Sequence, residues 1–463
     1  MRSFMKRVIG IGCVLGLPIV SLADEAADIK AIRAEMAALR KSYESRISNL
    51  EQQLSKVAAG RASTGSDSLM ASAPVATQPI ESSVSALRGG KPAALSSAFN
   101  PAIGVILNGR YSSFDNGGSE FAGFAVGEEG ERGREGLSLD ESEIMASANA
   151  DDKFAGSMTA ALVREDGSDK VELEEAYVKT LPGAGLPTGL SVKAGRAFWT
   201  FGYLNEHHSH ADDFADRPLP YRAFMNKAFN DDGVQVSYLL PTELYSEIGG
   251  GLFRGEDYPF GDGNSSGLTS WSGYARVGGD IGENQSWRLG GYLLAGDVGK
   301  RLANEDEVAF SGKTQLYSTD LRYTWAPTGN SKEQEVLLQS EYIWRNEDGT
   351  YEDTAAQTGA VDFDGTGTGF YVQSVYKFLP QWRVGARFSQ LDAATVPAGL
   401  VGSALDAEGY NPKAYSAMID WTNSEFSRIR LQFNHEELSQ GETDSQVILQ
   451  YVLSLGAHPA HAY

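Results

Sequence analysis

The sequence has almost no cysteine and, beyond its N-terminus, no long apolar run. Cys13 is the only cysteine among 463 residues. The rest of the chain therefore has neither an internal disulfide nor thiolate chemistry. After Val20 no stretch reaches the ~20 apolar residues that a spanning helix needs. A closed, hydrogen-bonded barrel is one way for such a chain to be stable in an exported compartment.

Positive charge is also scarce. The chain carries 39 Lys and Arg against 61 Asp and Glu, a formal net charge of −22. We therefore expect no nucleic-acid partner, and we expect cations to be attracted. Glycine is plentiful (52), Tyr and Phe are common (20 each), and the mean hydropathy is below zero. This composition suits a transmembrane barrel, because only alternate strand residues face lipid.

Residues 1–23 are predicted to be a secretory signal peptide. Arg2, Lys6 and Arg7 form a basic start, and an apolar run follows from Val8 to Val20. Small residues at 21–23 then provide a cleavage site. The chain is therefore expected to be exported.

Residues 24–57 predict a periplasmic coiled coil. Ile29, Ile32, Met36, Leu39 and Tyr43 follow the 3-4 spacing of an apolar seam, and charges of both signs flank it. An amphipathic helix that lies on another surface is the alternative. Residues 58–98 are rich in Ala, Ser, Gly and Pro without periodicity, which predicts a flexible linker.

From residue 99 to residue 463 the sequence predicts an all-β transmembrane domain, a porin-like antiparallel barrel of sixteen strands. Short alternating runs are bounded by Gly, Pro, Asn and Asp, and an even strand number is typical of bacterial outer-membrane barrels. The predicted strands are 103–112, 142–151, 155–165, 170–179, 188–197, 233–240, 243–254, 269–280, 284–295, 314–326, 332–346, 368–378, 381–391, 413–422, 425–435 and 445–456.

The connections between these strands alternate in length from the fifth onward. Tight turns are predicted at 151–153, 241–242, 282–283, 379–380 and 423–424. Long loops are predicted at 113–141, 198–232, 255–268, 296–313, 347–367 and 392–412. Short periplasmic turns and long extracellular loops are the signature of an outer-membrane barrel. We therefore expect the protein in a bacterial outer membrane, with its lipid as a partner.

Charged residues alternate with apolar ones in several predicted strands, so one face must point into the lumen. A charge on the lipid face costs ~2–4 kcal/mol at the midplane. The predicted pore-lining residues are Asp320, Arg322, Arg383, Arg387, Arg428 and Arg430. Two roles stay open for the arginines. They either brace the wall through lumenal carboxylates such as Asp420, or they contact the solute.

The predicted loop 198–232 contains three of the six histidines among several aspartates. Counted from a periplasmic N-terminus it is the third external loop, which in general porins folds inward and narrows the pore. Imidazole together with carboxylate suits zinc. The predicted metal ligands are His207, His208, His210, Asp212, Asp213 and Asp216, with His458 and His461 from the C-terminal end. A solvated, pH-sensitive surface loop is the alternative.

The motif Asn-Glu-His-His-Ser-His-Ala-Asp-Asp-Phe-Ala-Asp-Arg-Pro-Leu-Pro-Tyr-Arg at 205–222 resembles proteobacterial outer-membrane proteins known as zinc-regulated, TonB-dependent-like receptors. Segments 230–233 and 454–463 share this resemblance, which implies an association with zinc. The predicted coiled coil before a sixteen-stranded barrel is similar to phosphate-selective and sugar porins. We expect no TonB coupling, because such transporters hold a plug in a 22-stranded barrel.

These features favour an outer-membrane channel for the diffusion or capture of small solutes, with divalent cations, above all zinc, as the favoured solutes. No cofactor is required, and zinc is expected only as a bound or transported ion. No nucleophile motif or phosphate loop stands out, so we expect no enzyme. A homo-oligomer, in particular a trimer through barrel and coiled coil, is expected. Two alternatives remain: a general or anion/oligosaccharide-selective porin with incidental histidines, and a structural outer-membrane anchor.

Overall fold

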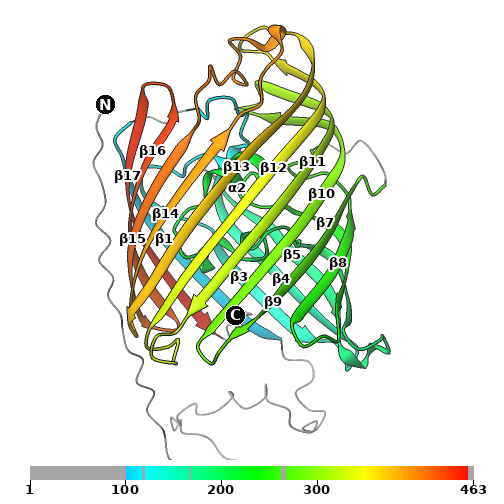
Figure 1. Cartoon of the computed structure of the whole chain (residues 1–463), viewed down its shortest axis with the longest axis vertical. Helices are drawn as coiled ribbons and strands as arrows, with labels where there is room; N and C mark the ends of the chain where they lie inside the picture. The colour runs from blue at the N-terminus through cyan, green and yellow to red at the C-terminus, as the bar shows by residue number, and fades with distance from the viewer. Residues whose placement is uncertain (1–100, 117–119, 166–167, 262–266, 457–463) are drawn as a thin grey trace, which may run out of the picture. The chain divides into compact units, whose positions relative to one another are not determined.

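The computed structural model describes residues 101–116, 120–165, 168–261 and 267–456. The predicted signal peptide, coiled coil and linker lie outside these residues, as do His458 and His461. The described part forms one antiparallel β-barrel, with connecting segments and a short helix inside it (Figure 1).

The strands are β1 (Ala102–Phe114), β2 (Gly136–Leu139), β3 (Ser142–Asn149), β4 (Phe154–Glu165), β5 (Ser168–Thr180), β6 (Leu190–Phe198), β7 (Asn230–Leu239), β8 (Tyr245–Phe253), β9 (Ser270–Ile281), β10 (Gln285–Ala303), β11 (Val308–Trp325), β12 (Glu335–Asp353), β13 (Ala360–Leu379), β14 (Trp382–Asp392), β15 (Lys413–Ser424), β16 (Ser427–Ser439) and β17 (Glu442–Gly456). The helices are η1 (Glu128–Gly130), η2 (Pro182–Ala184), η3 (Leu204–Glu206), η4 (Ser209–Ala211), α2 (Leu219–Met225) and η5 (Ala398–Leu400). No helix among the described residues is long and apolar enough to cross a membrane.

Strand β1 closes the barrel. On one side it pairs with β17, in the register Gly104↔Gly456 to Phe114↔Gln446. On the other side its first half pairs with β3 and its second half with β2. Strands β2 and β3 thus occupy a single position in the wall, which has sixteen positions in the described part of the chain. The predicted sixteen-stranded antiparallel barrel is confirmed.

Two of the predicted long loops were wrong. Residues 296–313 and 347–367 continue the hairpins β10–β11 and β12–β13, whose strands are 18–20 residues long. That is about twice the length needed to cross a bilayer. The Gly- and Asp-rich composition suggested loops, but the period of two continues through it. Inward residues of these extensions, such as Phe310 and Tyr351, are buried at 1 % exposure, and this burial holds the extended pairs together.

The outward face of β11 marks the membrane-facing belt. Tyr317, Leu321 and Trp325 point outward and are 37–49 % exposed, whereas the outward residues nearer the β10–β11 turn are polar. Eight residues separate Tyr317 from Trp325. They span about 26 Å along the strand and about 20 Å along a barrel axis at ~40° tilt. The belt on this strand thus covers most of the ~25 Å apolar band of an outer-membrane barrel.

Aromatic residues outline the two edges of the belt. At the upper edge the rings of Tyr342 and Phe370 stack with centroids 6.2 Å apart, and Phe388 contacts Tyr415 at 5.1 Å. Trp382 and Trp421 lie near the periplasmic turns, 6.5 Å apart. Aromatic girdles at both interfaces are typical of barrels in lipid. The closed barrel with this belt confirms the predicted location in a bacterial outer membrane.

Leu321→Arg is expected to destabilise the folded barrel by about 2–4 kcal/mol, because a guanidinium at the middle of the belt faces hydrocarbon. Ser311→Arg is the matched control: Ser311 is exposed on the same strand beyond the belt. Urea titration of the barrel in lipid vesicles measures both. Equal stability of the two variants would contradict the assignment of the belt.

The lumen contains an apolar core made by four external connections. We name them L1 (115–135), L3 (199–229), L4 (254–269) and L7 (393–412). Buried aromatic residues of L1 and L3 meet there: Phe124 contacts Phe224 with ring centroids 5.6 Å apart, and Phe229 contacts Phe253 of β8 at 5.2 Å. Helix α2 in L3 lies against β13 and β14, inside the barrel in Figure 1. These connections therefore fill the part of the lumen next to β13 and β14.

Candidate functional site

L3 leaves the wall after β6, folds into the lumen as predicted, and returns at β7. Its first turn is fixed by Glu341 of β12, which is 1 % exposed. The backbone N–H groups of Tyr203 and Leu204 donate to the Glu341 carboxylate over 3.1 and 3.2 Å. The hydroxyls of Tyr221 and Tyr371 donate to it over 2.8 and 2.6 Å. Four donors thus converge on one carboxylate.

Gly202 is required for this approach. Its φ of +72° lies in the left-handed region, and a Cβ there would collide with the Glu341 carboxylate and the Tyr221 hydroxyl. Glycine alone combines this φ with the absence of a side chain. The turn therefore brings L3 backbone directly onto the wall.

The middle of L3 is held by two of the predicted pore-lining arginines. Arg383 of β14 contacts Asp213 at 2.8 Å and the wall residue Asp420 at 2.6 Å. Arg387 contacts the Asp216 carboxylate at 2.7 Å and also donates to its backbone carbonyl over 2.7 Å. Charge-assisted pairs of this kind fix geometry as well as charge.

The other four predicted pore-lining residues are inward-facing and also paired. Arg428 donates to the backbone carbonyl of His210. Arg430, fully buried, donates to the carbonyl of Asp212 over 2.7 Å. Arg322 lies over the ring of Tyr203, 4.7 Å from its centroid. Asp320 accepts from Arg288 and Tyr292 of β10 over 2.7 and 2.6 Å. Of the two predicted roles, the bracing role fits these contacts.

The structure divides the predicted metal ligands into two groups. Asp212 pairs with Arg217 at 2.6 Å, and Asp213 and Asp216 pair with the wall arginines described above. The aspartates therefore do not join the histidines in one site. Guanidinium partners, one within L3 for Asp212 and two on the wall for Asp213 and Asp216, separate the aspartates from the imidazoles that precede them.

The histidines themselves differ. His207 stacks on Tyr203 with ring centroids 4.6 Å apart, and its Nδ1 lies 2.9 Å from the Tyr203 carbonyl. Burial lowers the pKa of His207 to about 4, and the nearby Arg217 and Arg322 act in the same direction. His207 is therefore neutral at physiological pH, and no carboxylate of the described residues contacts it.

His208 points away from His207 into a group of glutamates. Its Nε2 lies 3.0 Å from Glu175 Oε2, and its Nδ1 lies 3.3 Å from Glu143 Oε2 and 3.4 Å from Glu174 Oε2. His210 Nδ1 contacts the other oxygen of Glu143 at 2.8 Å. We call His208, Glu143, Glu174 and Glu175 the His208 cluster. It combines L3 with strands β3 and β5.

A β-bulge in β5 places two adjacent glutamates in the lumen. Thr159 pairs with Glu175 and Ala160 with Leu173, so Glu174 has no partner residue on β4. In a regular strand one of two successive residues would face lipid. The bulge inserts one extra residue and re-aims the side chain. The sequence Glu-Leu-Glu-Glu at 172–175 contained this signal, because it breaks the alternation of inward and outward residues.

Three atoms of the cluster lie close enough together to share a divalent cation. His208 Nδ1, Glu143 Oε2 and Glu174 Oε2 lie within 4.8 Å of one another, yet none makes a hydrogen bond of acceptable geometry. Ligand bonds of about 2.0–2.2 Å in a tetrahedral zinc site put neighbouring ligand atoms about 3.3–3.6 Å apart. The two distances from His208 Nδ1, 3.3 and 3.4 Å, agree with that spacing.

The same carboxylates control protonation of His208. Burial alone would lower its pKa, but Glu143, Glu174 and Glu175 raise the pKa well above its ordinary value. Without a metal ion, His208 is therefore an imidazolium that holds L3 against β3 and β5. A metal ion at Nδ1 would replace the proton there.

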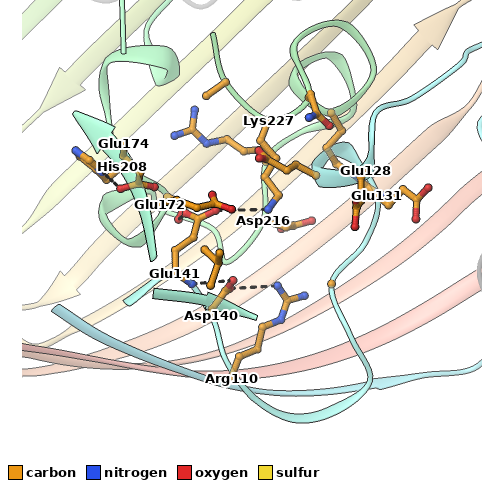
Figure 2. Close-up of a pocket in the computed structure, with 18 of the residues that line it drawn as sticks. Arg110, Glu128, Glu131, Asp140, Glu141, Glu172, Glu174, His208, Asp216 and Lys227 are labelled. Atoms are coloured by element: carbon orange, nitrogen blue, oxygen red, sulfur yellow. Dashed lines mark hydrogen bonds and ion pairs between the residues drawn. The ribbon is translucent and has the colours of Figure 1, made fainter. Parts of the chain in front are cut away.

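The cluster borders a lumenal cavity of about 1150 Å³. L1, β4, β5 and L3 line it, and His208 and Glu174 are among its lining residues (Figure 2). Acidic residues outnumber Lys and Arg in this lining by eleven to seven. This cavity is thus acidic and lies beside strands β4 and β5.

Comparison with known proteins gives one sequence relative and several structures. No family model matches the chain. A protein of Aquifex aeolicus (strain VF5), described only as uncharacterized, is 29 % identical over 395 residues, which cover 79 % of this chain and 80 % of the relative.

Solved structures of outer-membrane channels are similar to the barrel. OprB of Pseudomonas putida has a TM-score of 0.48 at 11 % identity, over 77 % of this chain and 94 % of that one. The anion-selective porin of Comamonas acidovorans has a TM-score of 0.48 at 11 % identity, over 77 % and 99 %. DcaP of Acinetobacter baumannii has a TM-score of 0.47 at 10 % identity, over 77 % and 97 %. The zinc-regulated receptors stay a resemblance.

Proposed function

We propose that the chain is a porin-like outer-membrane channel for small solutes, and that it passes or captures divalent cations, with zinc favoured. The observation that carries the choice of solute is the convergence of His208 Nδ1, Glu143 Oε2 and Glu174 Oε2. Imidazole with carboxylate oxygen is a ligand set that suits zinc. Calcium and magnesium favour oxygen alone.

Permeation requires that the ion can leave the site. Three ligand atoms are fewer than the four of a closed structural zinc site, and two of the residues, His208 and Glu174, border the cavity. The acidic lining raises the local cation concentration, and the cluster then binds the ion briefly. This is the balance of entry and exit that conduction demands.

His208→Ala is expected to weaken zinc block of the channel at least about tenfold, since it removes the imidazole that contacts both Glu143 and Glu174. His207→Ala is the matched control, because His207 lies in the same loop and contacts Tyr203, with no carboxylate of the described residues as a partner. Planar-bilayer conductance with increasing zinc measures both variants. The triple change of His207, His208 and His210 to Ala should behave like His208→Ala.

The same measurements separate the competing functions. Unaltered zinc block in His208→Ala would remove the metal proposal and leave the channel. Reversal potentials that favour anions would support an anion-selective porin, although the arginines expected to serve it bind L3. A barrel with no conductance would support the structural anchor.

We also propose that the protein is a homo-oligomer in lipid, with three copies as the favoured number. TonB coupling is not part of the proposal, and no cofactor is required. The predicted coiled coil would contribute to this assembly from outside the described residues. Mass measurement of the detergent-solubilised protein before and after heating tests the assembly.

A further inference from the structure

Lys227 is held at the edge of the lumenal cavity by a rigid backbone. Helix α2 is buried along its whole length and ends at Met225. Asn226 and Lys227 then both adopt left-handed conformations, with φ of +48° and +76°. The Asn226 side-chain oxygen accepts the N–H of Gly130 in L1 over 2.6 Å. Because this hydrogen bond joins L1 to L3, the backbone of Lys227 is held in one position.

Acidic side chains surround the Lys227 ammonium. Its Nζ lies 3.5 Å from Glu141 Oε1, and Figure 2 marks this ion pair with a dashed line. Burial would lower the pKa of Lys227, but Glu141, Glu129 and Asp140 raise it above the ordinary value, against the opposing charge of Arg110. The lysine is therefore positively charged at physiological pH. Its side chain is 35 % exposed, so the charge remains in contact with the water of the cavity.

We propose that Lys227 is a tethered counter-ion that determines the ion selectivity of the cavity. Its ammonium takes the place beside Glu141 that a mobile cation would otherwise occupy. This inference rests on the proposed channel function, because it concerns the flow of cations through the cavity toward the His208 cluster.

Tethering gives the ammonium an advantage over free cations. A group on a short covalent link competes at an effective concentration in the millimolar range, whereas trace divalent ions are far more dilute. Dilute divalent cations are therefore kept from Glu141. Glu141 also accepts a hydrogen bond from Ser209 over 2.6 Å, so the carboxylate keeps its position when the lysine is changed. Removal of Lys227 would expose an ordered acidic site to solution.

Lys227→Gln is expected to raise the cation-to-anion permeability ratio about threefold, since the substitution removes one fixed positive charge from the acidic cavity. Lys227→Arg restores the charge and should return the ratio toward wild type. Lys300→Gln, on an exposed position of β10, is the control for a change in net charge elsewhere. Reversal potentials in potassium chloride gradients across planar bilayers measure the ratio.

Glu141→Gln separates a role in selectivity from a role in packing. If Lys227 and Glu141 only brace L3 against the segment between β2 and β3, both variants loosen the same contact and shift the ratio in the same direction. If the charges determine selectivity, Glu141→Gln shifts the ratio toward anions and Lys227→Gln toward cations. Shifts in one direction, or none in Lys227→Gln, would overturn the inference. A wild-type channel without cation preference, or no channel at all, would instead contradict the proposed function.

Discussion

Glu341→Ala is expected to release L3 from the wall and to raise single-channel conductance at least about twofold, because the loop that fills the lumen loses its first anchor. The substitution removes the acceptor of four hydrogen bonds, from two backbone N–H groups and two tyrosine hydroxyls. Each buried donor left without a partner costs about 1–3 kcal/mol. Those donors are satisfied again only if the turn moves into water.

Glu341→Gln is the matched control for this variant. It keeps the size of the side chain and one acceptor oxygen, so L3 should stay nearer the wall and the conductance should change less. Trypsin cleavage after Arg222 provides a second readout, since Arg222 is buried in L3 and would become accessible. Wild-type conductance together with resistance to cleavage in Glu341→Ala would show that the arginine contacts alone fix L3.

Zinc affinity at the His208 cluster is expected to rise at least about tenfold for each pH unit while His208 is protonated, because each bound ion displaces at least the proton of His208. From pH 5.5 to 7.5 the concentration of zinc that half-blocks the channel should therefore fall at least about a hundredfold. The increase should end where the pH passes the raised pKa of His208. Conductance titrations with buffered free zinc at several pH values give this profile.

In the metal-free protein the pH dependence has the opposite sign, because the attachment of L3 to the wall weakens as the pH rises. The pKa of His208 is raised in the folded state, so its ion pairs stabilise the attachment of L3 fully below the unfolded pKa near ~6.5. That contribution is lost as the pH rises through the raised pKa. His208→Ala should flatten the zinc profile. A wild-type affinity that does not change between pH 5.5 and 7.5 would mean that zinc binds elsewhere.

The strand positions could be predicted from the sequence because each transmembrane strand has its own period-two pattern. Strand β14, predicted at 381–391, is Trp382–Asp392 in the structure, and β9, predicted at 269–280, is Ser270–Ile281. The extensions of β10 to β13 were not predicted, because beyond the lipid the contrast between the two faces reverses while the composition becomes rich in Gly and Asp. Outward residues are polar there, and the type of each inward residue depends on the loop against which it packs.

The site was predicted only in part, for a related reason. The sequence identified His208 and the inward course of L3, which are local features. The partners of His208 come from strands β3 and β5, and no local pattern links Glu143 to a histidine 65 positions further along the chain. The aspartates near the histidines in sequence turned instead to Arg217, Arg383 and Arg387. The ion pairs of His208 and of the aspartates depend on side-chain length and on distances across the lumen, which the local sequence does not contain.

The bulge in β5 also bears on how this site could arise and disappear. Loss of the codon for Glu174 would restore continuous pairing, since Leu173 and Glu175 already pair with the adjacent residues Ala160 and Thr159. Every other side chain of β5 would keep its face. A ligand of the cluster can thus be gained or lost by one in-frame insertion or deletion, while the barrel that carries it remains intact.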